Sequence, residues 1–291
     1  MSQRWVGTTY GNSRMHRWLI GMLRVIDVRV IYVIADVFVI PVCLAINHSR
    51  RTSYFYFRTI LGYGILRASW SVYANHCMFA RIVIDKFAMY AGRKFDVEVE
   101  GFGDFNRLAE REEGFLMMSS HIGNYEIAGY SLVSDRKSIN AVVYASEKQS
   151  VMENRSSMFS RTNVRMITLR QDMSHLFEIN SALSNGDIVS FPTDRFMGDA
   201  RYVEREFLGR TARFPQGPFS VAAMRGIDVL AVNVMKESAR RYRIFVTPLE
   251  YDRDASRSEQ IRQLSGAYVG ELEKRVKAYP LQWFNFYDFW N

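Results

Sequence analysis

The sequence predicts an α/β fold, in which an αβα layered domain with a mostly parallel central sheet follows an N-terminal helical, membrane-associated region. Three observations predict it. Short apolar or alternating stretches recur from residue 95 onward, helical patterns separate them, and a long apolar segment flanked by arginines lies near the start of the chain. Strands that alternate with helices favour a parallel sheet that is covered by helices on both faces.

Composition and charge limit the class of protein. The 291 residues are 48% hydrophobic and 23% charged, which suits a globular chain with one large core. The two cysteines, Cys43 and Cys77, have no metal-ligand or redox spacing and argue against a disulfide framework. The net charge is +8, and residues 1–60 supply +6 of it through eight Arg and two Asp. These arginines bracket an apolar stretch, which favours an anionic membrane surface over nucleic acid as the partner.

The apolar stretch covers residues 18–46, WLIGMLRVIDVRVIYVIADVFVIPVCLAI. A clean membrane span needs about 18 or more apolar residues without charge, and four charged residues interrupt this one (Arg24, Asp27, Arg29 and Asp36). We expect Arg29 and Asp36 to pair on one helical face, and Pro41 to kink the helix. A monotopic or shallowly inserted anchor is the favoured interpretation. A single span and a buried helix of a soluble domain are the alternatives, and the pattern of a secretory signal is lacking.

The remaining elements follow from periodicity. Residues 50–92 are rich in aromatic side chains and have apolar positions near a period of 3.6, which predicts two helices around a break at Gly62 and Gly64. Strands are predicted at 95–102, 115–120, 139–145, 164–169, 187–194, 229–235 and 242–250. Helices are predicted at 124–134, 149–160, 174–184, 217–225 and 258–277. We therefore expect a helical membrane-anchoring region over 1–94 and an α/β domain over 95–291.

One short motif, SSHIGNYE at residues 119–126, carries the candidate chemistry. It follows the apolar run FLMM, so it lies at the carboxyl end of a predicted strand, where parallel sheets bind ligands. Two residues five apart cannot share a face of a regular helix, so His121 must precede the helix if it is to meet Glu126. Gly123 then supplies the turn, Asn124 is a favoured N-cap, and Glu126 falls in the first turn. A carboxylate on one ring nitrogen would make His121 a general base; an ordinary capped helix start is the alternative.

The chain resembles a known family. The motif of histidine, four residues and an acid is similar to that of glycerolipid acyltransferases, and SSHIGNYE looks like the branch that acylates lipid A precursors in bacteria. The resemblance continues through ALSNGDIVSFPTD and FLGRTARFPQGPF and ends in the aromatic tail YPLQWFNFYDFW. It covers about residues 95–290 and, more weakly, the N-terminal anchor, and it would make 95–291 the acyltransferase domain within the lysophospholipid acyltransferase superfamily.

The resemblance implies transfer of a fatty acyl group from a thioester to a hydroxyl without a covalent enzyme intermediate. His121 and Glu126 would be the catalytic dyad, and the sequence contains no GxSxG elbow or visible metal triad. The family's further arginine and aspartate match Arg170, with Arg165 as a rival, and Asp194. In the turn from Pro192 to Arg195, Asp194 would hold a sugar or amine group of the substrate and Arg195 a phosphate or thioester oxygen; an ordinary surface pair is the alternative. Gly123, Asn124 and Pro192 complete the expected substrate-binding set.

These observations predict the partners and location of the protein. We expect no metal or cofactor, an acyl carrier protein as the favoured donor with acyl-CoA as the alternative, a membrane lipid as acceptor, and no nucleic acid. The expected location is the inner membrane, with the catalytic domain on the cytoplasmic side. Two other functions remain open: the protein is a non-catalytic, basic lipid-binding protein, or it is a lysophospholipid acyltransferase that uses acyl-CoA. The aromatic tail is expected either to pack on the domain or to lie at the lipid interface.

Overall fold

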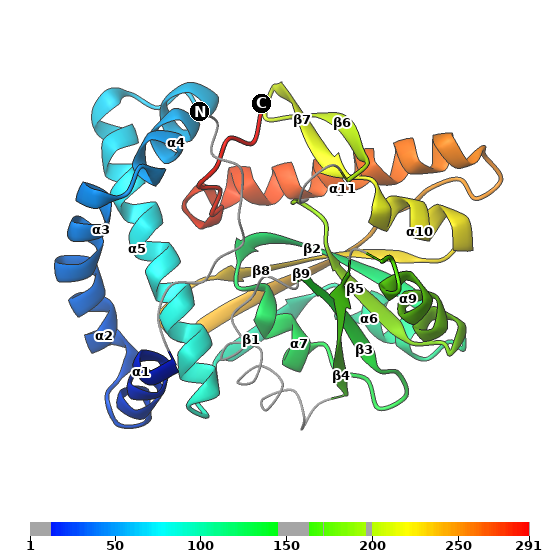
Figure 1. Ribbon diagram of the computed structural model, residues 1–291, viewed down its shortest axis with the longest axis horizontal. Helices are drawn as coiled ribbons and strands as arrows, with labels where there is room; N and C mark the ends of the chain where they lie inside the picture. Colours follow the sequence, from blue (N-terminus) through cyan, green and yellow to red (C-terminus); the bar gives the residue numbers. More distant parts are fainter. Residues whose placement is uncertain (1–12, 145–162, 171, 196–199, 291) are drawn as a thin grey trace.

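The computed structural model describes residues 13–144, 163–170, 172–195 and 200–290 (Figure 1). Its centre is a seven-stranded sheet of order β1-β9-β8-β2-β5-β3-β4. The strands are β1 (Asp96–Glu100), β2 (Phe115–Gly123), β3 (Ile139–Tyr144), β4 (Val164–Leu169), β5 (Ile188–Pro192), β8 (Val229–Lys236) and β9 (Arg241–Pro248). The pairing between β8 and β9 is antiparallel and the others are parallel. The predicted α/β class with a mostly parallel sheet is therefore confirmed.

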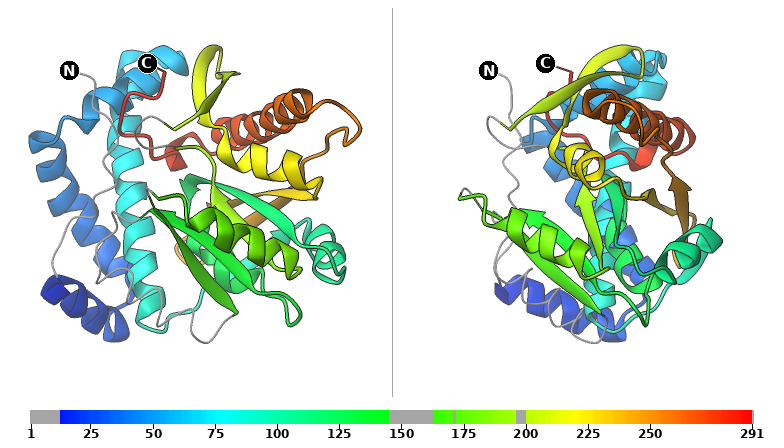
Figure 2. Two further views of the ribbon diagram at one scale, coloured as in Figure 1. Left: turned by 45° about the vertical axis from the view of Figure 1, so that its right-hand side comes forward. Right: turned by 90° about the vertical axis from the view of Figure 1, so that its right-hand side faces the viewer.

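Both faces of the sheet are covered, as the uninterrupted apolar run FLMM at the start of β2 requires. Leu116 and Met118 join a core with side chains of the helices α9 (His175–Ser184), α10 (Gly217–Arg225) and α11 (Arg257–Ala278). Phe115 and Met117 point to the opposite face and pack with α6 (Phe102–Ala109) and α7 (Ala128–Ser131). Figure 2 shows α10 and α11 together on one side of the sheet. The result is a layered αβα domain whose central strand carries the predicted site.

The N-terminal region is helical, as predicted. Its helices are α1 (Ser13–Val25), α2 (Val28–Ile34), η1 (Ala35–Val39), α3 (Ile40–Ile46), α4 (Ser49–Phe55), η2 (Tyr56–Ile60) and α5 (Ile65–Tyr90). They lie to the left of the sheet in Figure 1, and α2, η1 and α3 pack along α5. In the part of the chain that is described, Val28–Ile46 is the one helical stretch long and apolar enough to cross a membrane; its mean hydropathy is 2.3 and 22% of it is buried.

Two details of this segment differ from the expectations. Asp36 does not pair with Arg29; its carboxylate binds Arg81 of α5 at 2.5 Å instead. The reason is that α5 packs against this face and brings a guanidinium within reach. Pro41 lies in the first turn of α3, directly after the π-helical turn η1. In this position its missing N–H and its ring are tolerated, so the helix changes its winding before the proline rather than breaking at it.

A buried charged cluster connects the helical region to the sheet. Asp85 of α5 is fully buried and binds Lys236 of β8, Tyr242 of β9 and Tyr32 of α2. Burial raises the pKa of Asp85, against the opposing effects of Lys236 and the hydrogen bonds. Since removal of either partner would leave a buried group without its counterpart, this cluster fixes α5 against the strands.

Most predicted elements appear with small changes in their bounds. The break at Gly62 and Gly64 separates η2 from α5, and Gly62 has a positive φ of 68°. The predicted helix at 124–134 is shorter and consists of the 3₁₀ turn η3 (Tyr125–Ile127) followed by α7. The predicted helix at 149–160 lies outside the described residues. The antiparallel hairpin of β6 (Tyr202–Phe207) and β7 (Arg210–Pro215), and the short helix α6, were not predicted.

The aromatic tail packs on the domain. Trp283, Phe284 and Phe289 are at most 6% exposed and join the cores on the two faces of the sheet. Trp283 forms an antiparallel bridge with Ile122 at the end of β2. Of the two expectations for the tail, the structure therefore supports packing rather than exposure to lipid, and it brings the tail against the backbone of the predicted site.

Candidate active site

Gly123 creates the turn that ends β2. It has a φ of +58°, and a Cβ built on it would lie 1.8 Å from the carbonyl oxygen of Val234 in β8. Only glycine accepts both this conformation and this close approach. The strand continues further than predicted, through His121 to Gly123, with an irregular register between Ser119 and Gly123. Asn124 then donates its backbone N–H to Val234 O at 2.9 Å, so the motif remains attached to the sheet.

His121 and Asp194 meet at the carboxyl ends of two neighbouring parallel strands. Ser119 of β2 is in register with Pro192 of β5, and each of the two functional residues follows its strand partner by two positions. The ring atom Nδ1 of His121 lies 2.7 Å from Asp194 Oδ1, and the backbone N–H of His121 donates to Oδ2 at 2.8 Å. The carboxylate therefore fixes both the backbone and the ring of the histidine.

The environment of Asp194 favours its ionised form. Its side chain is 1% exposed, and burial by itself would raise the pKa. The charge of His121, the hydrogen bond from its ring, the charge of Arg195 and the backbone N–H of His121 outweigh burial and hold the pKa of Asp194 below its usual range. Because a carboxylate only accepts hydrogen bonds, Nδ1 carries the hydrogen in this pair, and the lone pair of the neutral ring is on Nε2.

Arg195 and the aromatic tail close the site on one side. Arg195 is 9% exposed, its Nε lies 4.0 Å from Asp194 Oδ2, and it donates to Phe284 O at 2.6 Å. Its guanidinium also lies 5.4 Å from the ring centroid of Tyr287. Phe284 in turn directs its N–H to His121 O at 3.5 Å. The expected alternative of an ordinary surface pair between Asp194 and Arg195 is therefore wrong, because both side chains are buried.

Glu126 is held by the helical region. Its side chain is 4% exposed, and Oε1 lies 2.5 Å from Lys86 Nζ of α5. Tyr90 of the same helix donates its hydroxyl hydrogen to Oε2 at 3.0 Å. The motif predicts that Glu126 binds the ring of His121 and orients it, whereas the carboxylate on Nδ1 is that of Asp194. The role of Glu126 as the second member of the dyad stays a prediction.

Asn124 and Pro192 line the same end of the sheet. Asn124 precedes the turn η3, but its side chain makes no capping hydrogen bond and its Nδ2 is buried without a partner, so the predicted N-cap interaction is wrong. The turn has three residues, and the backbone N–H of Ile127 donates to the backbone carbonyl oxygen of Asn124 instead. Pro192 is the last residue of β5. Because it has no N–H to donate, the strand ends there and the following turn presents Asp194.

The two candidate arginines lie at the edge of the sheet. Arg170 follows β4, and its guanidinium binds Glu178 of α9 at 2.5 Å and Ser174 at 3.1 Å. Strand β4 is three positions from β2 in the sheet order, and spacings of about 4.8 Å place it about 14 Å away. Arg165, within β4, is exposed. The structure therefore does not place either arginine next to the histidine, and a substrate contact for Arg170 stays a prediction.

Sequence reasoning missed Lys86, Tyr90 and Phe284. Lys86 and Tyr90 are separated by four positions, which is the spacing of neighbours on one helical face. That spacing is the one signal in the sequence, and it is too common to identify a site. Among the residues described, no group of three or more His, Cys, Asp or Glu side chains is arranged to hold a metal ion.

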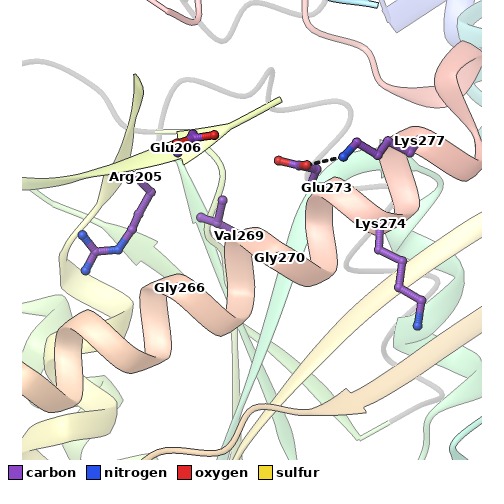
Figure 3. A pocket seen from close by; sticks show the side chains of 8 residues that line it. All are labelled: Arg205, Glu206, Gly266, Val269, Gly270, Glu273, Lys274 and Lys277. Carbon is purple, nitrogen blue, oxygen red and sulfur yellow. Dashed lines mark hydrogen bonds and ion pairs between the residues drawn. The ribbon is translucent and has the colours of Figure 1, made fainter. Parts of the chain in front are cut away.

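A separate groove of about 480 Å³ lies between the hairpin and α11 (Figure 3). Its lining carries charges of both signs: Arg205, Lys274 and Lys277 alternate with Glu206 and Glu273. None of the predicted site residues lines this groove. On α11, Tyr268 donates its hydroxyl hydrogen to Ser119 O in β2 at 3.0 Å, so this helix also contacts the strand that carries the histidine.

A His–Asp pair at the end of the central strand, with the aspartate buried and the histidine ring partly exposed, on an αβα fold with apolar N-terminal helices, defines a candidate membrane-associated acid–base enzyme. The family described as bacterial lipid A biosynthesis acyltransferase matches residues 63–291, and the chain belongs to this family. It is an O-acyltransferase. The predicted family and enzyme class are confirmed.

A solved structure of the 1-acyl-sn-glycerophosphate acyltransferase PlsC from Thermotoga maritima is similar to this chain with 13% identity and a TM-score of 0.42, and the match covers 94% of this chain and 100% of that one. No curated protein matches the chain.

Proposed function

We propose that this acyltransferase transfers a fatty acyl group from an acyl thioester, carried by an acyl carrier protein, to a hydroxyl of a lipid A precursor or a related membrane glycolipid or aminolipid. The observation that carries the mechanism is the bond between His121 Nδ1 and the buried, ionised Asp194. It leaves Nε2 as the basic atom of the ring, at the end of a parallel strand where substrates bind.

The reaction then proceeds as general base catalysis. Nε2 of His121 takes the proton of the acceptor hydroxyl while its oxygen attacks the thioester carbonyl carbon. The carbon–sulfur bond breaks, and the imidazolium returns the proton to the departing thiolate, so that an ester and a free thiol are formed. The negative charges of Asp194 and Glu126 stabilise the imidazolium that exists between these steps.

The proposed membrane attachment rests on exposed apolar side chains. Phe38, Ile46, Leu66 and Trp70 are 66–87% exposed, and they come from η1, α3 and α5. Large apolar side chains exposed on helices that pack together are typical of a membrane contact. Because the other face of Val28–Ile46 packs on α5, and Ile82 and Met89 of α5 join the core on one face of the sheet, we propose a monotopic attachment to the cytoplasmic face of the inner membrane, with arginines beside anionic lipid.

The experiment measures transfer of a labelled acyl group from acyl carrier protein to a lipid A precursor by purified variants. His121→Ala should lose nearly all activity, and Glu126→Ala about two to four orders of magnitude, the range that general base catalysis supplies. Far-ultraviolet circular dichroism should show that both variants are folded. Full activity of a folded His121→Ala protein would contradict the mechanism. Mass spectrometry of lipids from a deletion strain and its complemented parent would identify the acceptor.

A further inference from the structure

Both carboxylate oxygens of Glu126 are bound by side chains from one face of α5. Lys86 Nζ lies 2.5 Å from Oε1, and Tyr90 donates to Oε2 at 3.0 Å. The two residues are four positions apart, so α5 presents them together. The helix belongs to the N-terminal region, whereas Glu126 belongs to the α/β domain, and the interaction therefore joins two parts of the chain at the predicted dyad.

The two contacts of Glu126 favour its ionised form. The carboxylate is 4% exposed and Lys86 is 20% exposed. An isolated carboxylate in such surroundings would be strongly disfavoured in its ionised form, and a hydrogen-bonded cation offsets that penalty. Two donors to different oxygens also fix the rotation of the carboxylate plane, which a single ion pair would leave free.

We propose that Lys86 and Tyr90 are positioning residues of the acyltransferase, which hold Glu126 ionised and in one orientation for its action on the histidine. The inference rests on the proposed function, in which Glu126 is the second member of the dyad. It assigns to α5 a part of the active site that the motif at 119–126 does not contain. Folding of the α/β domain alone would then leave the dyad incomplete.

Alternative roles for the two residues predict different behaviour. A purely structural ion pair would affect only the stability of the protein. Its removal would lower the amount of active enzyme, and the loss of activity caused by replacing Glu126 would stay the same. A substrate contact by Lys86 would change KM. If the two residues position Glu126, their replacement lowers kcat and leaves KM nearly unchanged, and this loss disappears when Glu126 itself is replaced.

The test uses full-length enzyme with the variants Lys86→Met, Lys86→Arg and Tyr90→Phe, each in the wild-type and in the Glu126→Gln background. Lys86→Met should lower kcat by about 10- to 100-fold, the range expected when a catalytic group is misplaced by about 1 Å. Lys86→Arg, which keeps the charge and the donors, should recover most of the activity. Tyr90→Phe removes one hydroxyl and keeps the ring packed, so it tests the same idea with little effect on folding.

Arg81→Met is the matched control, because Arg81 lies on the same helix and its ion pair is made with Asp36. It should leave kcat unchanged although it removes an ion pair of the same length. In the Glu126→Gln background, Lys86→Met and Tyr90→Phe should cause less than about a twofold further loss.

Equal losses from Lys86→Met in both backgrounds, or wild-type kcat for Lys86→Met and Tyr90→Phe, would overturn the positioning role. His121→Ala is measured in parallel: its activity reports on the acyl-transfer mechanism, so a failure of the proposed function is distinguished from a failure of this inference.

Discussion

Replacement of Asp194 by asparagine tests how the tautomer of His121 is set. The carboxylate accepts two hydrogen bonds from one residue, at 2.7 Å from the ring Nδ1 and at 2.8 Å from the backbone N–H. Asparagine has nearly the same shape but one acceptor oxygen and one NH₂ group. The backbone N–H of His121 can only donate, so it requires the asparagine oxygen to face it. The NH₂ group must then face Nδ1, which can meet it only as an acceptor.

The variant therefore places the ring hydrogen on Nε2 and removes the basic lone pair from the substrate side. The opposite orientation of asparagine would keep the tautomer, but it sets two donors against each other at a buried site, which costs about 1–3 kcal/mol and makes the correct tautomer about 5- to 150-fold rarer. The variant also lacks the negative charge that stabilises the imidazolium. The same replacement beside a histidine base lowers kcat by about 10⁴-fold, and we expect the two effects together to give a loss of that order for Asp194→Asn.

The assay is single-turnover acyl transfer from labelled acyl carrier protein, combined with ¹⁵N NMR of the histidine ring to identify the protonated nitrogen. Asp228→Asn is the control, because Asp228 is an aspartate whose ion pairs with Arg111 and Arg253 lie at the surface; its activity should change less than about twofold. An Asp194→Asn enzyme within tenfold of the wild-type kcat, or one whose ring hydrogen stays on Nδ1, would refute the reasoning.

Three further predictions concern the turn, the anchor and the donor. Gly123→Ala should lower the free energy of unfolding by more than about 2 kcal/mol, because its Cβ would meet Val234 O at 1.8 Å. Gly209→Ala, with a φ of +78° and no atom within 4 Å, should show only the smaller cost of backbone strain. Equal losses of stability for the two variants in thermal unfolding would contradict the clash at Gly123. In membrane vesicles, the exposed Cys43 should react with a lipid-soluble maleimide and not with a sulfonated one. Burial raises the pKa of Cys77 to about 11 and should protect that thiol from both reagents until the protein is denatured. Labelling of Cys43 by the sulfonated reagent would place α3 in water. With acyl carrier protein as donor, kcat/KM should fall more steeply than with acyl-CoA between about 50 and 300 mM salt, because the Debye length shortens from about 14 to about 6 Å. Identical salt responses of the two donors, together with a preference for acyl-CoA, would overturn the donor assignment.

The strands could be predicted from the sequence because their signal is local. FLMM and VLAVNVM are buried on both faces, and their apolar runs, broken only by Asn233 in the second, show it directly. The hairpin was missed because alternate residues of Tyr202–Phe207 are exposed and polar, so no apolar run marks the strand. The eight-residue helix α6 is too short for a clear period.

The site was predictable to the extent that it depends on strand ends. His121 follows one predicted strand and Asp194 ends another, and a parallel sheet brings such positions together. Which acid would bind the ring depended on the neighbourhood of β2 and β5 and on their register, which sequence periodicity does not contain. The contacts of Glu126 depend on the packing of α5 across the chain, over sequence separations of 36 residues and more, and no local pattern reports such contacts.

The cluster around Asp85 has a consequence for synthesis of the chain. Lys236 lies 151 positions after Asp85, so at 5–20 residues per second it leaves the ribosome about 8 to 30 s later. During this interval the contacts of α5 with α2, within the first 90 residues, can already form. The ion pair with Asp85, and with it the attachment of the helices to the sheet, must wait until β8 has been translated.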